Sequence, residues 1–374
     1  MRVIFTCGGT GGHINPAIAV AKILRERKPD AEILFVGADD GMETNLVPRE
    51  GFKIETVTIS NYLRSFTPSA VWHNVKAVVA IRRALRRADR IIRDFKPDVI
   101  LGTGGYASYP MLRQGVKNGI PTALHEANAV PGLATKMVCD KVDKILVSFA
   151  ESRSEYKNAE RVIPVGMPVR EEFVFTKRAD ARKELGLDDK PLIVSAWGSL
   201  GAREMNKKIA QFMKLECADD KYYHIHATGS FGWRWMPEYV RELGVDLAAH
   251  PLITMQEYIY NMPTVTAAAD VMICRAGSST LNEIAAAGTP CIIVPSPNVT
   301  NNHQEKNARI LENRGAAVVI READCDGEKL YQTVQGLLAD KEKQAKMRTA
   351  LRELAVIDSA ERIYQILLDL IKSR

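Results

Sequence analysis

A glycine-rich segment close to the N-terminus has the composition of a phosphate-binding loop. Residues 7–13 read Cys-Gly-Gly-Thr-Gly-Gly-His, with a short apolar run before them at 2–5 and an alanine-rich helical pattern after them at 17–24. Glycine lets the backbone turn sharply and places no Cβ in the way of a ligand. A helix N-terminus offers free N–H groups to a phosphate. A tight strand-to-helix turn without a ligand is the alternative. Four glycines are more than such a turn needs, so we favour a ligand site.

The second half of the chain repeats this plan and adds hydroxyl groups. The apolar run 192–197 leads into Gly-Ser-Leu-Gly-Ala-Arg at 198–203. Further on, a predicted helix holds Ser278, Ser279 and Thr280 in its first turn. Hydroxyls and free N–H groups at such a helix start suit a diphosphate.

Two more polar elements belong to this second half. Glu283 lies one helical turn beyond the hydroxyls, where a carboxylate can accept hydrogen bonds from both hydroxyls of a ribose. Helix-dipole pairing, or a capping box with Ser279 or Thr280, is the alternative, and spacing alone does not separate the two. Residues 302–304, Asn-His-Gln, bring amide donors to the same edge of the predicted sheet.

Two loops of the first half are expected beside the N-terminal glycine loop. Residues 102–108 form a second glycine-rich loop after a fourth strand, and His-Glu-Ala-Asn at 125–128 follows a fifth. Ligands of parallel sheets lie beyond the carboxyl ends of the strands, so three such loops at one edge favour a site. The alternative for His125 and Glu126 is a pair of loop residues that only satisfy hydrogen bonds.

The strands and helices that position these loops alternate along the whole chain. This alternation predicts α/β domains with parallel sheets covered on both faces, two of one plan with a cleft between them. We expect a first domain over 1–168, a second over 169–355, and an amphipathic C-terminal helix within 356–374 that ties them together. The runs expected as strands are 2–5, 33–36, 54–59, 99–101, 122–124, 145–147, 162–165, 192–197, 223–227, 271–274 and 291–294.

The composition is that of a folded chain of ordinary domains. Its 374 residues suit two domains, with 46% apolar and 26% charged residues. No apolar run is long enough to span a bilayer, and the short run before the first glycines does not resemble a signal peptide. The six cysteines lie far apart without a CxxC pair, which favours free thiols in a reducing cytoplasm.

The positive charge is concentrated in one predicted helix, residues 68–95. The net charge is +6, and residues 71–96 alone carry eight Lys/Arg against two Asp, which accounts for all of it. A basic patch on a neutral body argues against nucleic-acid binding and favours one anionic surface. The residues expected on the core-facing stripe of this helix are Val78, Ile81, Leu85, Ala88, Ile92 and Phe95.

The opposite face of this helix has an apolar tip followed by arginines. The tip is Trp72, Val75 and Val79, and the arginine row is Arg82, Arg86, Arg90 and Arg93. Such a face suits an anionic bilayer, because the tip can enter the interface while the arginines meet lipid phosphates. A solvated basic face with Trp72 packed under a loop is the alternative.

Several reaction classes lack their motifs in this chain. No GxxxxGK[ST] is present, which disfavours a P-loop kinase. Without HExxH or CxxC a bound zinc is not expected, and the acidic pair in 324–326 reads better as a helix cap than as a metal site. A leaving diphosphate would then be stabilised by helix dipoles and hydrogen bonds rather than by a metal.

Five motifs, in order, resemble those of one bacterial family. They are Gly-Gly-Thr-Gly-Gly-His at 8–13, Gly-Gly-Tyr at 104–106, His-Glu-Ala-Asn at 125–128, Gly-Ser-Leu-Gly-Ala-Arg at 198–203, and the most specific, Arg-Ala-Gly to Glu-Ile-Ala-Ala-Ala-Gly, at 275–288. Over nearly its whole length the chain resembles the MurG family, the UDP-N-acetylglucosamine transferases of peptidoglycan synthesis. This resemblance implies a GT-B fold with two Rossmann-like domains.

The resemblance also implies the reaction and the partners. The reaction is transfer of GlcNAc from UDP-GlcNAc to the C4 hydroxyl of the MurNAc of lipid I, giving lipid II with inversion, without a metal or cofactor. The first domain would hold the acceptor and contact the membrane, and the second would hold UDP-GlcNAc. The expected location is the cytoplasmic face of the plasma membrane, as a peripheral protein.

By position in the motifs, the resemblance assigns roles to residues of both domains. Those expected to hold UDP are Ser199, Ser278, Ser279, Thr280, Glu283 and Gln304, with Ile259 beside the uracil and Arg170 near the diphosphate. Those expected at the sugar and the acceptor are Thr10, Gly11, Gly12, Asn128, Gly104, Gly105, Tyr106 and His125. His13 is the first candidate for the general base, since imidazole titrates near working pH, and Glu126 is the second.

Some positions depart from the family pattern. Trp197 stands where the family usually has Gly, and Met167 stands where we expect Asn. Residues 231–236, Phe-Gly-Trp-Arg-Trp-Met, match nothing in it.

Two other classes remain open at this point. Another GT-B sugar-nucleotide enzyme, or a catalytically silent sensor that binds UDP-GlcNAc without product, fits the same residues. A nicotinamide-dependent oxidoreductase is the other class, because Asp39 and Asp40 follow the second strand where a ribose-binding acid can lie. The repeated second domain argues against the oxidoreductase.

Overall fold

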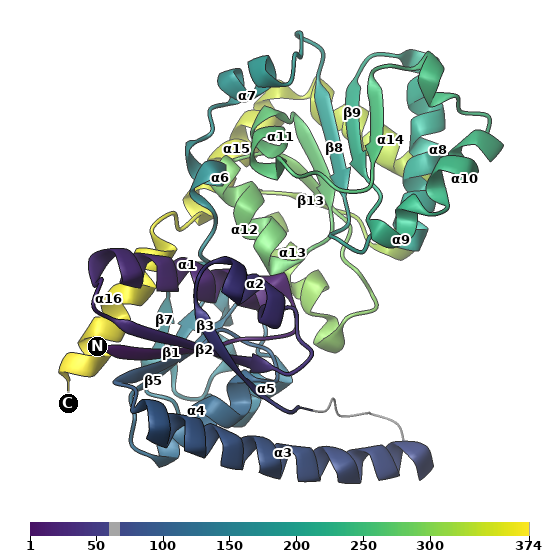
Figure 1. Ribbon diagram of the computed structural model, residues 1–374. Helices are drawn as coiled ribbons and strands as arrows, with labels where there is room; N and C mark the ends of the chain where they lie inside the picture. The colour runs from purple at the N-terminus through teal and green to yellow at the C-terminus, as the bar shows by residue number, and fades with distance from the viewer. Residues whose placement is uncertain (60–67, 374) are drawn as a thin grey trace. The chain divides into compact units, whose positions relative to one another are not determined.

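The computed structural model describes residues 1–59 and 68–373, with the backbone alone for 68–79. The chain divides into two compact units, each described here by itself (Figure 1). The first contains Met1–Val169 together with Val356–Arg374, and the second contains Arg170–Ala355. The C-terminal segment therefore returns to the first unit.

The first unit is built on a seven-stranded parallel sheet. Its strand order is β3-β2-β1-β4-β5-β6-β7, so the chain starts in the middle and winds outward in both directions. The apolar runs form strands because they are buried on both faces of the sheet. Their bounds are β1 Arg2–Thr6, β2 Glu32–Ala38, β3 Lys53–Val57, β4 Val99–Gly102, β5 Thr122–Glu126, β6 Lys144–Val147 and β7 Val162–Pro164.

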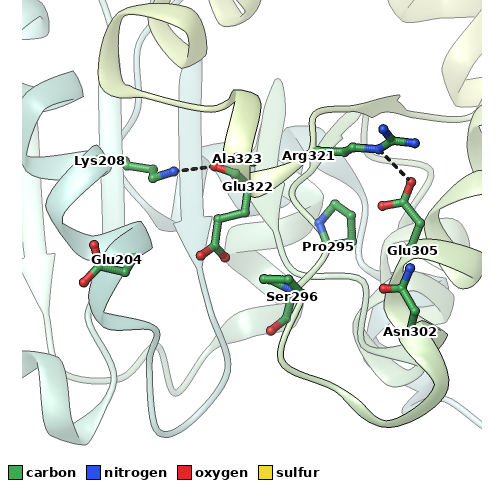
Figure 2. Close-up of a pocket in the computed structure, with 10 residues that line it drawn as sticks. Glu204, Lys208, Pro295, Ser296, Asn302, Glu305, Arg321, Glu322 and Ala323 are labelled. Atoms are coloured by element: carbon green, nitrogen blue, oxygen red, sulfur yellow. Dashed lines mark hydrogen bonds and ion pairs between the residues drawn. The ribbon is translucent and has the colours of Figure 1, made fainter.

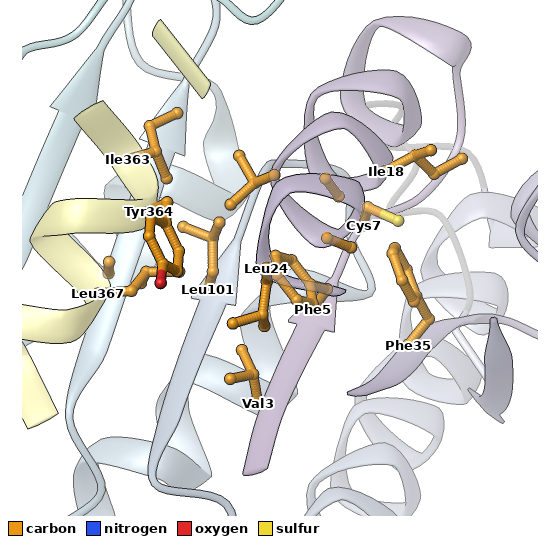
Figure 3. Packing of buried hydrophobic residues seen from close by; sticks show 14 of the residues in the cluster. Val3, Phe5, Cys7, Ile18, Leu24, Phe35, Leu101, Ile363, Tyr364 and Leu367 are labelled. Carbon is orange, nitrogen blue, oxygen red and sulfur yellow. The ribbon is translucent and has the colours of Figure 1, made fainter. Parts of the chain in front are cut away.

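Helices cover both faces of this sheet. On one face α1 (Gly11–Arg27) and α16 (Ser359–Lys372) pack over Phe5 and Leu101, as Figure 3 shows. The rings of Phe5 and Phe35 stack there with centroids 5.3 Å apart. On the other face the core is completed by α3 (Pro68–Phe95), α4 (Ser108–Lys117) and α5 (Leu133–Val138). The shorter helices are α2 (Glu43–Arg49) and the 3₁₀ turns η1 (Ala150–Glu155) and η2 (Ala159–Arg161).

The basic helix α3 forms as predicted, with one shift of its buried face. Ala88 and Ile92 are buried as expected, but Ile91 and Ala84 are buried too, whereas Ile81, Leu85 and Phe95 are only half-buried. The predicted stripe was therefore centred slightly off, since the buried face of the helix runs along Ala84, Ala88, Ile91 and Ile92. Exposure of the arginine row is confirmed for Arg82, Arg86, Arg90 and Arg93. The apolar tip, Trp72, Val75 and Val79, lies outside the described side chains, as does Val78.

The second unit has a six-stranded parallel sheet of order β10-β9-β8-β11-β12-β13. Its central strand β8 again starts the unit, which repeats the plan of the first. The strands are β8 Leu192–Ala196, β9 Tyr223–Ala227, β10 Ile253–Gln256, β11 Val271–Cys274, β12 Cys291–Ile293 and β13 Val318–Val319. All four runs predicted as strands here are confirmed. The short strands β10 and β13 were not predicted.

The helices of the second unit flank this sheet. The long ones are α8 (Arg203–Asp219), α12 (Ser278–Ala287), α13 (His303–Asn313), α14 (Gly327–Ala339) and α15 (Lys341–Leu354). The short ones are α6 (Glu171–Phe175), α7 (Arg178–Glu184), α9 (Ser230–Trp233), α10 (Met236–Glu242) and α11 (Met262–Ala268), with the 3₁₀ turns η3 (Leu247–Ala249), η4 (Thr300–Asn302) and η5 (Glu322–Asp324). The helices α8 and α12 follow the two central strands, so their N-termini lie at the carboxyl edge of the sheet.

One boundary of the first unit differs from the prediction. We expected His125 and Glu126 in a loop after the fifth strand, but they are the last two residues of β5 and pair with Leu146 and Val147 of β6. Both side chains are buried. The strand continues through them because each finds hydrogen-bond partners inside the fold.

Candidate active site

Two glycine loops of the first unit meet at the carboxyl edge of its sheet, as predicted. The first loop follows β1 and contains Gly9 at φ +90°, and the second follows β4 and contains Gly104 and Gly105 at φ +113° and +80°. The Cβ that alanine would add at Gly105 would lie 2.2 Å from the carbonyl oxygen of Gly8. Only glycine therefore allows this close approach of the two backbones.

His13 lies where these loops meet. A Cβ on Gly104 would come within 2.6 Å of its ring, and the Thr103 hydroxyl donates to its carbonyl oxygen at 2.6 Å. Its Nδ1 lies 3.0 Å from the carbonyl oxygen of Gly8. Because a carbonyl only accepts, Nδ1 carries a proton, and in the neutral ring the lone pair is therefore on Nε2. The ring is half-buried and oriented as a proton acceptor through Nε2.

A carboxylate that the sequence analysis missed supports the first loop from inside. Glu43 is buried and accepts hydrogen bonds from the N–H groups of Gly9 at 3.2 Å and Ala38 at 2.7 Å. Gly37 and Gly41 lie so close that a Cβ on either would come within 2.3 Å of it. No motif marks Glu43 in the sequence, although glycines on both sides of it were a signal of close packing.

Glu126 is occupied by hydrogen-bond donors of its own loop. Its two oxygens accept from the Asn128 N–H at 3.0 Å, the Gly132 N–H at 3.1 Å and the Thr135 hydroxyl at 2.7 Å. The Asn128 amide donates as well, at 3.3 Å. These contacts hold the segment 126–135 in place and occupy both oxygens of the Glu126 carboxylate.

His125 lies inside the unit rather than at its edge. Its ring is fully buried, and Nε2 lies 2.9 Å from the carbonyl oxygen of Gly166. Burial lowers its pKa below the usual value, so the ring is neutral. Its burial favours a packing residue over acceptor binding, with Nε2 hydrogen-bonded and Nδ1 without a hydrogen-bond partner among the described residues. Thr10 and Tyr106, in contrast, are exposed at the edge, and Gly11 and Gly12 are half-buried there.

The second unit forms a comparable glycine loop after β8. Gly198 and Gly201 have φ +83° and +80°, and a Cβ on Gly201 would lie 2.0 Å from the Thr228 carbonyl oxygen. Ser199 is exposed, and its carbonyl accepts from the Ser230 N–H at 3.0 Å. Trp197, where the family pattern has glycine, is buried beneath the loop, so it does not occupy the exposed edge.

The first turn of the helix α12 carries N–H groups and hydroxyls at the carboxyl edge of the sheet, as a diphosphate site needs. Its N-cap is Gly277, which provides no side-chain cap, so the capping-box alternative for Glu283 is not formed at this helix start. Ser278 is buried, whereas Ser279 and Thr280 are half-buried in the first turn. Burial raises the pKa of Glu283 to about 7, and the nearby charge of Arg170 opposes that rise. Glu283 is thus poised between its two protonation states near neutral pH.

Gln304 joins two loops at the same edge. Its Oε1 accepts from the N–H groups of Ser296 at 2.9 Å and Ala276 at 3.3 Å, so its amide nitrogen is the part left to donate to a ligand. Ile259 is buried, so only its main-chain groups can serve a base, while Tyr258 and Tyr260 beside it are exposed.

A cavity of about 470 Å³ opens beside Gln304 in the second unit (Figure 2). Asn302 and Glu305, which flank Gln304, line it together with Glu204 and Lys208 of α8 and residues 321–323. Lys208 Nζ donates to the carbonyl oxygens of Glu322 and Cys325 at 2.6 and 2.5 Å. Arg275, which the sequence analysis left without a role, pairs with Glu322 at 2.5 Å and ties the end of β11 to this wall.

The acidic pair at 324–326 acts as a cap, as predicted. The Asp326 carboxylate accepts from the Lys329 N–H at 2.7 Å and so caps α14. Within residues 1–59 and 68–373, no group of three or more His, Cys, Asp or Glu side chains is arranged to hold a metal ion. No helix in the part of the chain that the structure describes is long and apolar enough to cross a bilayer.

Comparison with known proteins identifies two matching family models. The glycosyltransferase family 28 N-terminal domain matches residues 3–147, and the family 28 C-terminal domain matches residues 193–363. The first match lies within the first unit, and the second covers most of the second unit and extends into α16, which belongs to the first unit.

Similar curated proteins are UDP-N-acetylglucosamine--N-acetylmuramyl-(pentapeptide) pyrophosphoryl-undecaprenol N-acetylglucosamine transferases. The one from Acetivibrio thermocellus is 39% identical over 100% of this chain and 99% of its own length. That from a Thermoanaerobacter species is 42% identical, covering 98% and 99%. Among solved structures, MurG of Acinetobacter baumannii superposes with a TM-score of 0.76 at 26% identity, covering 98% of this chain and 99% of that one.

Proposed function

This chain belongs to the MurG family of glycosyltransferases, and we propose that it transfers GlcNAc from UDP-GlcNAc to the C4 hydroxyl of the MurNAc of lipid I. Its fold is GT-B, with a parallel α/β sheet in each unit. As a member of this family it is a hexosyltransferase that serves the synthesis of peptidoglycan precursors. The acceptor, the stereochemistry and the roles of single residues are our proposal.

The observation that carries the proposal is the state of His13. Its Nδ1 faces a carbonyl, so Nε2 can accept the proton of the acceptor hydroxyl as that oxygen attacks the anomeric carbon of GlcNAc. A single displacement of this kind breaks the bond to UDP as the new bond forms, and it inverts the anomeric carbon. Thr10, Gly11, Gly12 and Asn128 are proposed to hold the sugar and the acceptor diphosphate beside it.

The departing UDP is proposed to bind the second unit. The N–H groups and hydroxyls in the first turn of α12 suit the diphosphate, with Ser199 and Arg170 as further donors. Glu283 is assigned to the ribose hydroxyls and Gln304 donates through its amide nitrogen. This set of donors supports a reaction that needs no metal.

The membrane side of the function rests on α3. Arg82, Arg86, Arg90 and Arg93 are exposed along one side of a long helix, which suits an anionic bilayer on which a lipid-linked acceptor is carried. We propose a peripheral enzyme on the cytoplasmic face of the plasma membrane. Replacing the four arginines by glutamine is expected to weaken binding to anionic vesicles strongly.

The deciding experiment is transfer of labelled GlcNAc to a short-chain lipid I analogue. We expect a lipid II product with UDP-GlcNAc and little with UDP-GalNAc as control, both in the presence of a metal chelator. UDP-GlcNAc that binds without giving product would instead indicate a sugar-nucleotide sensor. Product lost on chelation would contradict metal independence.

A further inference from the structure

The aromatic segment 231–236 has no part in the proposed reaction. It reads Phe-Gly-Trp-Arg-Trp-Met and forms α9 and the start of α10 in the second unit. It lies directly beside the loop after β8, because the Phe231 N–H donates to the Leu200 carbonyl at 3.3 Å. The segment is thus fixed by backbone hydrogen bonds to the glycine loop that follows β8.

The fold turns the large side chains of this segment outward. Gly232 is buried, and a Cβ on it would lie 2.2 Å from the Asn206 amide nitrogen. Phe231 and Trp233, on either side of it, are 58% and 41% exposed, and Leu200 is 58% exposed. Three large apolar side chains therefore face solvent at or beside one short helix. Clusters of exposed apolar side chains of this kind mark interaction sites.

Two arginines accompany these side chains without a carboxylate partner. The Arg234 guanidinium lies 5.7 Å from the Phe231 ring centroid, and that of Arg203 lies 5.5 Å from the Trp235 ring. Within the described residues neither forms an ion pair, although the neighbouring Lys207 and Arg241 pair with Glu204 and Glu238 at 3.1 and 2.8 Å. The two guanidinium groups keep their N–H donors for an anion.

We propose that Leu200, Phe231, Trp233, Arg203 and Arg234, here called the aromatic patch, form a contact of the second unit with an anionic phospholipid bilayer. Aromatic rings with one apolar and one polar environment settle at the headgroup level of a membrane. Arginines beside them meet lipid phosphates there. Charge complementarity selects anionic over zwitterionic lipid.

The shape of the patch agrees with a bilayer more than with a bound peptide. Phe231 and Trp233 are exposed on the four-residue helix α9, and none of the five patch residues lines the cavity of Figure 2. A protruding apolar tip with cations around it enters an interface, whereas a peptide or small ligand needs a groove. The contact lies in a different unit from the arginine row of α3 and does not depend on the reaction.

The first test is co-sedimentation of the full chain with vesicles of equal parts phosphatidylcholine and phosphatidylglycerol. The double variant Phe231→Ser, Trp233→Ser is expected to bind about tenfold more weakly than the parent. Phe175→Ser, which removes a side chain that is 69% exposed and has no guanidinium over its ring, is the control and should bind like the parent. Equal binding by the double variant and the parent would overturn the proposal.

A second test places the contact at Trp233 itself. Tryptophan fluorescence of the parent should be quenched by vesicles that contain brominated lipid, and Trp233→Phe should lose part of that quenching while still sedimenting. An unchanged quenched fraction in Trp233→Phe would mean that Trp233 stays in water, and the patch would not be a bilayer contact.

The arginines are tested by a matched pair of variants. Arg234→Gln should weaken binding about fivefold, whereas Arg241→Gln removes an equally exposed arginine that already has a carboxylate partner and should change binding little. If both variants lose vesicle binding equally, the loss would be explained by the change in net charge alone, and a specific role of Arg234 would be contradicted. Glutamines in the α3 arginine row test the other contact, so either contact can fail alone.

Discussion

The two glycine loops follow equivalent strands but are closed by different partners. In the first unit the loop after β1 is pressed by Gly105 of the loop after β4, and His13 is held at that junction. In the second unit the loop after β8 is pressed against Thr228, which follows β9 on the other side of the central strand. One plan therefore yields two kinds of site, depending on which neighbouring loop closes on it.

The difference divides the chemistry between the units. The first loop carries the imidazole of His13, while the second carries Ser199 and Arg203, neither of which can accept a proton near neutral pH. The ionisable residue of the second unit, Glu283, comes instead from the helix after β11. The comparison supports the proposal that the proton acceptor belongs to the first unit and anion binding to the second.

Removing the imidazole is expected to give the largest effect. His13→Ala should lower kcat by about 10²–10⁴ with little loss of stability, because it deletes the general base. Steady-state transfer to the lipid I analogue measures this, with thermal unfolding as the control for folding. Near-normal turnover would move the assignment to Glu126 and break the division between the units.

The crowded glycines test the loop closures directly. Gly105→Ala and Gly201→Ala should each lower stability by about 3 kcal/mol or more, since each adds a Cβ within 2.2 Å or less of a backbone oxygen at positive φ. Gly9→Ala and Gly198→Ala are matched controls, because they have φ +90° and +83° with no atom near the added Cβ. These controls should lose only about 1–2 kcal/mol. If all four variants lose the same free energy of unfolding, the cost would come from the positive φ alone and not from the close contact between the loops.

Glu283 should show opposite effects on stability and on donor binding. Its pKa is raised to about 7, so the folded state keeps a proton that the unfolded state loses between pH 4.5 and 7. Stability therefore declines as pH rises through this window. Glu283→Gln removes the penalty and should be more stable than the parent by about 2–3 kcal/mol above pH 7, and equal to it below pH 4.5.

The same variant should bind UDP-GlcNAc about tenfold more weakly at pH 8, because an amide is a poorer acceptor for ribose hydroxyls. In the parent, affinity should fall as pH drops below about 7, and in Glu283→Gln this dependence should flatten. Calorimetric titration at several pH values measures both. A variant with unchanged affinity would indicate that Glu283 does not meet the ribose.

The smallest effect on turnover is expected at Glu126. Glu126→Gln should lower the free energy of unfolding by about 1–3 kcal/mol, because an amide nitrogen would face donors that the carboxylate now satisfies. Its kcat should stay within severalfold of the parent's. A loss of turnover as large as that of His13→Ala, with stability preserved, would reverse the two roles.

The fold was predictable because its buried strands are continuous apolar runs, spaced regularly between glycine loops and helices. Every run expected as a strand is one, since continuous apolar runs between glycine loops have few other uses. The strands that escaped prediction, β10 and β13, are edge strands: β10 mixes apolar and polar residues, and β13 is only two residues long. The end of β5 was misplaced because His125 and Glu126 look like loop residues until their buried partners are known.

The site was predictable only in part. The meeting of the two loops of the first unit followed from strand order, and the open start of α12 followed from its serines and glycine. The support of Gly9 by Glu43, and the pairing of Arg275 with Glu322, join residues that are distant in sequence. Such pairings depend on tertiary packing, and a single sequence contains no pattern for them.

The return of α16 to the first unit bears on how the polypeptide matures during synthesis. Ile363, Tyr364 and Leu367 complete a core that Val3 and Phe5 begin, so that core stays unfinished until α16 has been synthesised. The second unit, an uninterrupted stretch from Arg170 to Ala355, can close earlier. Assembly of this protein therefore runs against the usual order, in which N-terminal domains fold first, and a nascent chain that stalls near its end would expose the apolar face of α1.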